Sequence, residues 1–153
     1  MFRRLLREFA PALALAKLTM VLNHGGSPLA DTQRYTVQCN PVLLQTLFSN
    51  LLQNALEASP AGGKIVVTFN TAKPATAEND ATLAIEIHNS GAIPQDIQQR
   101  FFQKYATSGK PGGTGLGTYS ALLIAEAHGG GISFTSSEAD GTRVLVTLPM
   151  LSE

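Results

Sequence analysis

Apolar residues recur along the chain with two different periods, and these periods predict its elements. Over residues 41–58 the spacing is that of an amphipathic helix, with Asn40 as N-cap, Pro41 as first residue and Ser59 at its end. Its apolar face comprises Leu44, Leu47, Phe48, Leu51, Leu52 and Ala55. This helix is the best-defined element of the sequence.

Strict alternation of apolar and polar positions in residues 64–69 and 83–87 predicts two half-buried strands that form a long antiparallel hairpin. Nearer the N-terminus, β-prone runs at 18–23 and 35–39 predict two short strands on either side of a turn at 25–28.

In the last third of the chain a helical spacing of apolar residues is again followed by the alternation typical of strands. A helix is expected over residues 116–128, ended by the three glycines at 129–131. Strands at 132–136 and 143–148 follow, with a turn at Asp140 and its following glycine. The predicted order is therefore α, β, β, α, β, β, a long loop, α, β, β.

The first sixteen residues form a separate amphipathic pattern. Its apolar side comprises Phe2, Leu5, Leu6, Phe9 and Leu13, and the opposite side carries Arg3, Arg4 and Arg7. We expect residues 1–16 to be a helix that packs on a domain spanning 17–153, or that is the remnant of a linker or dimerisation region. Binding to a membrane surface is a weaker alternative, because each arginine contributes only about 1 kcal/mol.

Composition narrows the classes of protein. The 153 residues are 44% hydrophobic, enough for one domain with its own core, and 11 basic residues balance 11 acidic ones. This balance favours neither nucleic acid nor anionic lipid as a partner. The single Cys39, expected in a buried strand, excludes an internal disulfide and fits a reducing compartment. The apolar run at 9–22 is too short to cross a bilayer.

Two patterns indicate phosphate chemistry. Gly113, Gly115 and Gly117 alternate with larger residues just before a helix, where backbone N–H groups and the helix dipole favour an anion. Asn50 and Asn54 stand four residues apart, so their amides share one helix face and suit a hydrated Mg²⁺.

Other phosphate-binding signatures do not fit. The pair Gly109 and Lys110 is followed by Pro111, so it is not a P-loop. The glycine run follows an irregular loop and precedes antiparallel strands, unlike a dinucleotide-binding fingerprint. The lysine strand and catalytic loop of protein kinases are absent.

Four segments in order resemble the ATP-binding catalytic domain of bacterial sensor histidine kinases, in the superfamily shared with type II topoisomerase, heat-shock chaperone and mismatch-repair ATPases. The resemblance covers about residues 18–149. Its asparagine box reads Asn-Leu-Leu-Gln-Asn-Ala at 50–55, its first glycine box Asn-Ser-Gly-Ala-Ile-Pro at 89–94, its phenylalanine box Phe-Phe-Gln-Lys-Tyr at 101–105, and its second glycine box Gly-Thr-Gly-Leu-Gly at 113–117.

The resemblance implies an α+β fold of the Bergerat type, a two-layer α/β sandwich whose mixed, mostly antiparallel sheet carries helices on one face. It implies ATP and Mg²⁺ as ligands, with Asn54 on the metal and Asn50 beside the phosphates as the catalytic pair. The sequence itself predicts a lid over residues 91–113, a glycine- and proline-containing stretch with a single short helical pattern at 95–102. The nucleotide-binding residues would be Asn50, Asn54, Asn89, Gly91, Lys104, Tyr105, Lys110, Gly113, Thr114, Gly115, Leu116, Gly117 and Thr142.

The chain departs from the family pattern at several positions. Asn89 replaces the aspartate that usually accepts a hydrogen bond from the adenine amino group. Its carbonyl still accepts that bond, and its NH₂ has hydrogens for a ring nitrogen. Glu57 replaces a lysine found in some members, which leaves Lys104 and Lys110 as candidate phosphate-binding cations.

The resemblance also implies transfer of phosphate rather than hydrolysis of ATP. In hydrolysing members a glutamate activates water at the position of Asn50, and an amide cannot act as a general base. The γ-phosphoryl group would therefore pass to a nucleophile from outside the domain.

None of His24, His88 and His128 has the setting of a phosphate acceptor, and each is expected to be structural. The expected partners are a histidine-bearing dimerisation domain, within the same parent protein, and a response regulator. We expect a cytoplasmic location, with a parent protein that can be membrane-attached. The two alternative functions are a non-catalytic ATP-binding regulatory module and an anti-sigma-type serine kinase.

Overall fold

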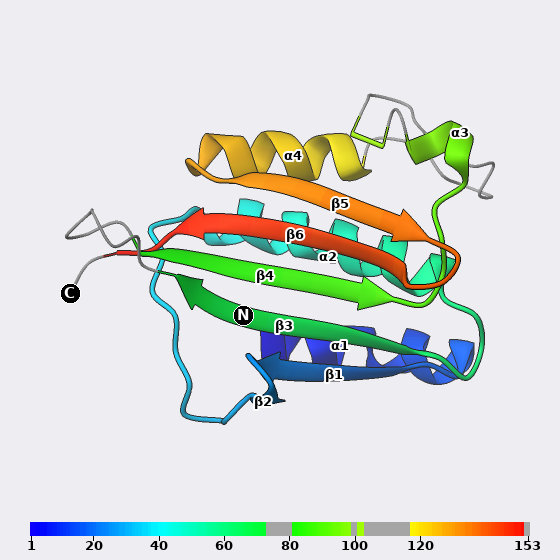
Figure 1. Ribbon diagram of the computed structural model, residues 1–153. Helices are drawn as coiled ribbons and strands as arrows, with labels where there is room; N and C mark the ends of the chain where they lie inside the picture. The colour runs from blue at the N-terminus through cyan, green and yellow to red at the C-terminus, as the bar shows by residue number, and fades with distance from the viewer. Residues whose placement is uncertain (73–80, 99–100, 103–116, 152–153) are drawn as a thin grey trace.

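The computed structural model describes residues 1–72, 81–98, 101–102 and 117–151 of the chain. In this part helices and pairs of strands follow one another along the chain in the predicted order, except that the second strand lies elsewhere (Figure 1). They are α1 (Phe2–Ala16), β1 (Thr19–His24), β2 (Ser27–Pro28), α2 (Pro41–Ala58), β3 (Lys64–Ala72), β4 (Thr82–Asn89), α3 (Gln95–Gln98), α4 (Gly117–Ala127), β5 (Gly131–Ser137) and β6 (Gly141–Pro149).

The strands form one six-stranded sheet in the order β2-β1-β3-β4-β6-β5. β1 and β3 pair in parallel, and the other neighbouring strands pair antiparallel. The longer helices α1, α2 and α4 lie behind the sheet in the view of Figure 1, on one face. The predicted two-layer α/β sandwich with a mixed, mostly antiparallel sheet is confirmed, as is the β3–β4 hairpin.

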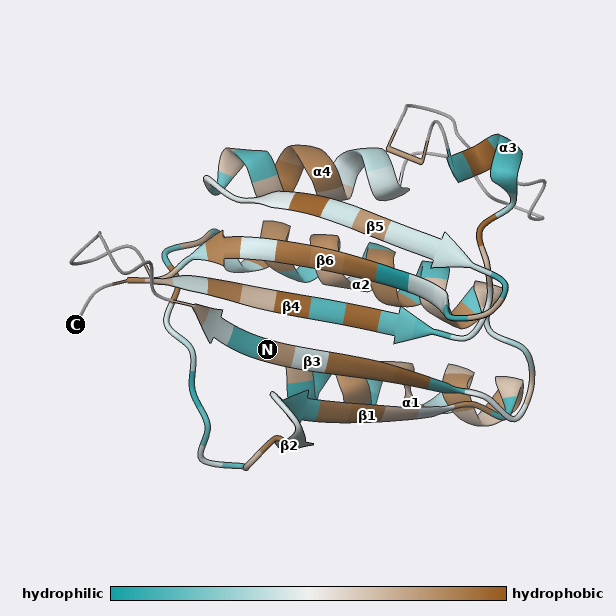
Figure 2. Cartoon of the chain, in the orientation of Figure 1, coloured by the Kyte–Doolittle hydropathy of each residue, from teal (hydrophilic) through white to brown (hydrophobic). Residues whose placement is uncertain are grey.

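Helix α2 contacts both α1 and α4, and its sequence supplies a cap and an apolar face. The Asn40 side chain accepts hydrogen bonds from the N–H groups of Val42 and Leu43, at 3.1 and 3.2 Å. All six residues of the predicted apolar face are buried. They pack against alternate residues of β3, β4 and β6, which Figure 2 shows as apolar bands along the strands.

Helix α1 is part of the same hydrophobic core. Leu5 and Leu13 are buried, and the Phe2 ring contacts Phe48 of α2 and Phe69 of β3, with centroids 4.6 and 5.1 Å apart. The apolar side of α1 therefore packs against α2 and the sheet. No helix in the described ranges is both long and apolar enough to cross a membrane.

The strand predicted at 35–39 is wrong. After β1 the chain turns at Gly25, and β1 pairs instead with Ser27–Pro28. These residues follow the turn directly, so a tight hairpin brings them next to β1. The Tyr35 ring stacks on Phe69 and its hydroxyl contacts His24 Nδ1. This aromatic side chain therefore packs against the sheet although its backbone is not in a strand. Burial raises the pKa of the Tyr35 phenol.

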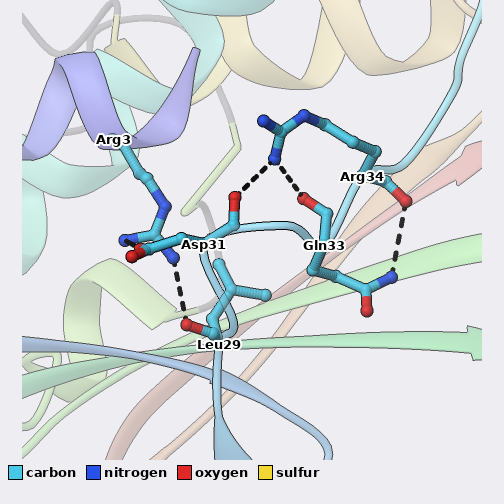
Figure 3. Close-up of polar contacts among 5 residues, drawn as sticks. All are labelled: Arg3, Leu29, Asp31, Gln33 and Arg34. Atoms are coloured by element: carbon cyan, nitrogen blue, oxygen red, sulfur yellow. Dashed lines mark hydrogen bonds and ion pairs between the residues drawn. The ribbon is translucent and has the colours of Figure 1, made fainter.

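The segment before α2 is held by arginines rather than by a ladder of backbone bonds (Figure 3). Arg3 of α1 forms an ion pair with Asp31 at 3.1 Å and donates to Leu29 O at 3.0 Å. Arg34 donates to the backbone oxygens of Asp31 and Gln33. Cys39, in the same segment, is half-buried in a loop, so its prediction as a buried strand residue is wrong.

Helix α4 and the turn before it lie close to where the sequence predicts them. The helix begins at Gly117, and its C-terminus is closed by Gly129, with φ of 79°, as the sequence predicts. Of the helical pattern expected at 95–102, the structure has α3 at Gln95–Gln98 and a turn at Phe101 and Phe102, and residues 99–100 lie outside the described ranges. Most of the predicted lid at 91–113 lies outside the described residues.

Two leucines of α1 test whether this helix contributes to stability. Leu5→Ala is expected to lower the free energy of unfolding by about 2–5 kcal/mol, because Leu5 is fully buried. Leu15→Ala is the matched control, since Leu15 is 88% exposed, and should change it by less than about 0.5 kcal/mol. Urea unfolding measures both. Equally small effects would contradict the packing of α1 in the core.

Candidate functional site

The candidate site lies where α2 and β4 end and where α4 and β6 begin, at the right-hand end of Figure 1. α2 contributes Asn50 and Asn54, which stand one turn apart and are both half-buried. Asn50 Nδ2 donates to Gly117 O, at the first residue of α4, over 3.3 Å. The two helices pack side by side, so the start of α4 is held against the asparagine face of α2.

Gly91 brings the chain after β4 into contact with the last turn of α2. A Cβ atom at this position would lie 1.8 Å from Ala58 O, far inside contact distance, so only glycine permits the approach. Gly141 has the same function on the other side: its φ is 76°, and a Cβ there would lie 2.0 Å from Asn89 O. The backbones of α2, β4 and β6 therefore meet at this end of the sheet.

A directed chain of hydrogen bonds runs through this contact. The Thr142 hydroxyl donates its hydrogen to Gly91 O at 2.7 Å. The 2.9 Å bond between Ser136 Oγ and Thr142 Oγ1 is consequently donated by Ser136. Ile93 N–H donates in turn to Ser136 Oγ at 2.8 Å, and Asn89 Nδ2 is a second donor to Gly91 O at 3.3 Å.

The buried side chain of Asn89 uses its amide nitrogen in this chain of bonds but not its amide oxygen. The residue is only 3% exposed, and one N–H of its amide is used by Gly91 O. Within the described part of the protein, no donor reaches its Oδ1 atom. A buried acceptor without a partner is rare in folded proteins and points to a ligand that supplies a donor.

The phenylalanines of the third sequence box pack on the domain. The rings of Phe101 and Phe102 contact Phe134 of β5, with centroids 4.5 and 5.8 Å from it. The buried Thr118 hydroxyl donates to Phe101 O at 2.5 Å, which ties the same turn to the start of α4. Sequence reasoning missed Thr118 and Ser136, because a lone hydroxyl residue has no distinguishing spacing.

The described residues that the resemblance assigned to the nucleotide form two groups at this end of the domain. Asn50 contacts Gly117, with Asn54 one turn along α2, and Asn89 and Thr142 both donate to Gly91 O. The other predicted nucleotide residues, Lys104, Tyr105, Lys110, Gly113, Thr114, Gly115 and Leu116, lie outside the described residues.

The three histidine rings have structural partners, as the sequence suggested. His24 contacts Tyr35, and His88 Nε2 donates to Asp140 O at 2.6 Å. His128 Nδ1 donates to Ile124 O, while its Nε2 accepts from the N–H of Asn40, so the ring joins the end of α4 to the start of α2.

The described residues contain no cluster of three or more His, Cys, Asp or Glu side chains that would hold a metal by themselves. The oxygens of Asn50 and Asn54 are hard, neutral donors. Mg²⁺ often takes one or two such protein ligands together with water and substrate phosphates. The amide pair therefore fits a magnesium ion that arrives with a phosphate ligand.

One protein family matches most of the chain. The family model described as "Histidine kinase-, DNA gyrase B-, and HSP90-like ATPase" matches residues 39–152. Sporulation kinase E of Bacillus subtilis is 33% identical over 114 residues, which cover 74% of this chain and 15% of that protein. The sensor histidine kinase WalK of the same organism is 31% identical over 131 residues, covering 82% and 20%. The chain thus spans a fifth or less of these relatives.

Solved structures agree on the fold. The catalytic domain of histidine kinase ThkA superposes with a TM-score of 0.70 at 23% identity, covering 96% of this chain and 88% of that one. Full-length ShkA in complex with AMPPNP gives a TM-score of 0.75 at 17% identity, covering 99% and 29%. At these identities the similarity establishes the Bergerat-type architecture and no more.

The close approach of Gly91 gives a direct test of the site geometry. Gly91→Ala is expected to lower the free energy of unfolding by about 1–3 kcal/mol, because the methyl group overlaps Ala58 O unless the backbone moves. Gly26→Ala is the control, since apart from its chain neighbours no atom lies within 4 Å of the place that its Cβ would take. Thermal unfolding compares the two variants. A neutral Gly91→Ala would mean that the end of β4 and α2 are not in contact.

Proposed function

The chain belongs to the family of histidine kinase-, DNA gyrase B- and HSP90-like ATPases, and on that premise we propose that it binds Mg²⁺-ATP and donates the γ-phosphoryl group to a histidine of a separate dimerisation domain. The observation that carries the proposal is the buried, unpartnered Oδ1 of Asn89, which lies beside Gly91 and Thr142 in the described part of the chain. An exocyclic amino group of adenine supplies the donor that this acceptor lacks.

The remaining groups suit the rest of the nucleotide. The start of α4 is a helix N-terminus, whose dipole favours phosphate, and Asn50 donates a hydrogen bond to its first residue, Gly117. Asn54, one turn further along, is the proposed ligand of Mg²⁺, which when bound neutralises phosphate charge. Lys104, Tyr105 and Lys110 and the glycines of the second glycine box are proposed to complete the site.

Transfer rather than hydrolysis is proposed because the amide pair offers no base. Asn50 stands where hydrolysing members of the superfamily have a glutamate, and its amide does not accept a proton from water. The domain's own part is to bind and orient ATP and to limit access of water. The histidines of the chain have structural partners, so the acceptor would come from another domain, with α1 as part of the connection and a response regulator downstream.

Asn54→Ala should abolish the Mg²⁺ dependence of ATP binding or weaken binding by at least about tenfold, since the metal loses a ligand. Gln53→Ala is the matched control, because Gln53 is an exposed amide on the same helix that is bonded to Glu57. Calorimetric titration with and without a chelator measures both. If neither Asn54→Ala nor chelation changes the affinity, the magnesium assignment is wrong.

Phosphoryl transfer can be measured with γ-labelled ATP and an acceptor hairpin from a sensor kinase. We expect an acid-labile phosphohistidine on the hairpin and little release of inorganic phosphate without it. The Asn89→Leu variant should lose transfer, because its acceptor for the base is gone. Binding of ATP with no transfer to any hairpin would favour a regulatory module, and labelling of a partner's serine would favour a serine kinase.

A further inference from the structure

Ser136 has no role in the proposed chemistry, yet it connects the two segments that border Asn89. It belongs to β5, the outermost strand, and faces Thr142 in the register of β5 and β6. Its oxygen accepts from Ile93 N–H at 2.8 Å, and its hydrogen goes to Thr142 Oγ1 at 2.9 Å. One side chain therefore sets both the position of the segment after Gly91 and the direction in which the Thr142 hydroxyl donates.

The Gly91 carbonyl oxygen, which can only accept, determines how the Asn89 amide can lie, and Ser136 helps to hold the segment that carries it. Gly91 O receives the Thr142 hydrogen at 2.7 Å and the Asn89 Nδ2 hydrogen at 3.3 Å. If the amide turned over, its Oδ1 atom would face Gly91 O, and two acceptors would lie in contact. Gly91 is also packed closely against the backbone of Ala58, which limits its movement. The NH₂ group is thereby held toward Gly91, and Oδ1 is left as the acceptor for a ligand.

We propose that Ser136 is a positioning residue that, through Thr142 and Gly91, locks the Asn89 amide and makes the site select 6-amino over 6-oxo purines. The inference rests on the proposed function. A 6-amino purine presents an N–H donor next to a ring acceptor, which complements the amide oxygen and the remaining amide N–H. A 6-oxo purine presents an acceptor and a ring N–H, and would pair only with the turned amide. An aspartate at position 89 would be an acceptor in either orientation and would need no such lock.

Mg²⁺-ATP and Mg²⁺-ITP are the matched probes, because they differ only at the 6-position and the adjacent ring nitrogen. For the unmodified chain we expect ATP to bind on the order of 100-fold more tightly than ITP, since the wrong base leaves buried groups unpaired. Ser136→Ala should reduce this preference by about tenfold, mainly through tighter ITP binding as the amide becomes free to turn. Ser136→Thr keeps the hydroxyl and should restore the preference. Ser133→Ala, an exposed serine of the same strand, is the control and should leave the ratio unchanged.

A second pair of variants tests the route through Thr142. Thr142→Val removes the hydroxyl with little change of shape, and should reduce the ATP-to-ITP preference as Ser136→Ala does. Because both act on one chain of bonds, the double variant should lose no more than the larger single effect, whereas independent effects would multiply. Urea unfolding of each variant establishes that the domain is folded before titration.

The outcomes separate this inference from the proposed function. If the unmodified chain binds neither nucleotide, both are overturned. If it binds ATP and ITP equally, or if Ser136→Ala weakens both by the same factor and leaves their ratio unchanged, only the inference is overturned. A reduced ratio in Ser136→Ala, restored by threonine and non-additive with Thr142→Val, establishes Ser136 as the positioning residue.

Discussion

Contact between backbones at one end of the sheet determines where the groups of the site can lie. Gly91 meets Ala58 at the end of α2, and Gly141 meets Asn89 at the end of β4, at distances that no side chain would allow. Thr142, the residue after Gly141, can then bond to Gly91 O. The close approach of these backbones is possible because glycine has no side chain, and it determines where Asn89 and Thr142 lie.

The sequence predicted best those parts in which several local signals agree. α2 was predicted at its correct start because Asn40, Pro41 and the apolar spacing all support the same helix. The strand at 35–39 failed because β propensity describes a half-buried surface rather than a pairing partner. β1 pairs with Ser27 and Pro28 instead, and Tyr35 is packed in an aromatic stack with Phe69.

For the site, the sequence predicted which segments matter but not the bonds that join them. Asn50, Asn89 and Gly117 were found from the order of four motifs. Ser136 was not, because the serines of β5 look alike in the sequence. Only the register with β6 places Ser136 opposite Thr142, and register depends on contacts between distant residues.

The parallel pairing of β1 with β3 has a consequence for any shorter version of the domain. The family match begins at residue 39, after β1, yet β1 is bonded along β3 from Thr19 with Lys64 to His24 with Phe69. A fragment cut at that boundary would leave β3 as a long edge strand with unpaired N–H and C=O groups beside exposed apolar residues. Such an edge is a template for pairing with another chain. The first strand therefore covers this edge of β3 and leaves in its place the edge of a shorter strand, which β2 covers at Asn23 and His24.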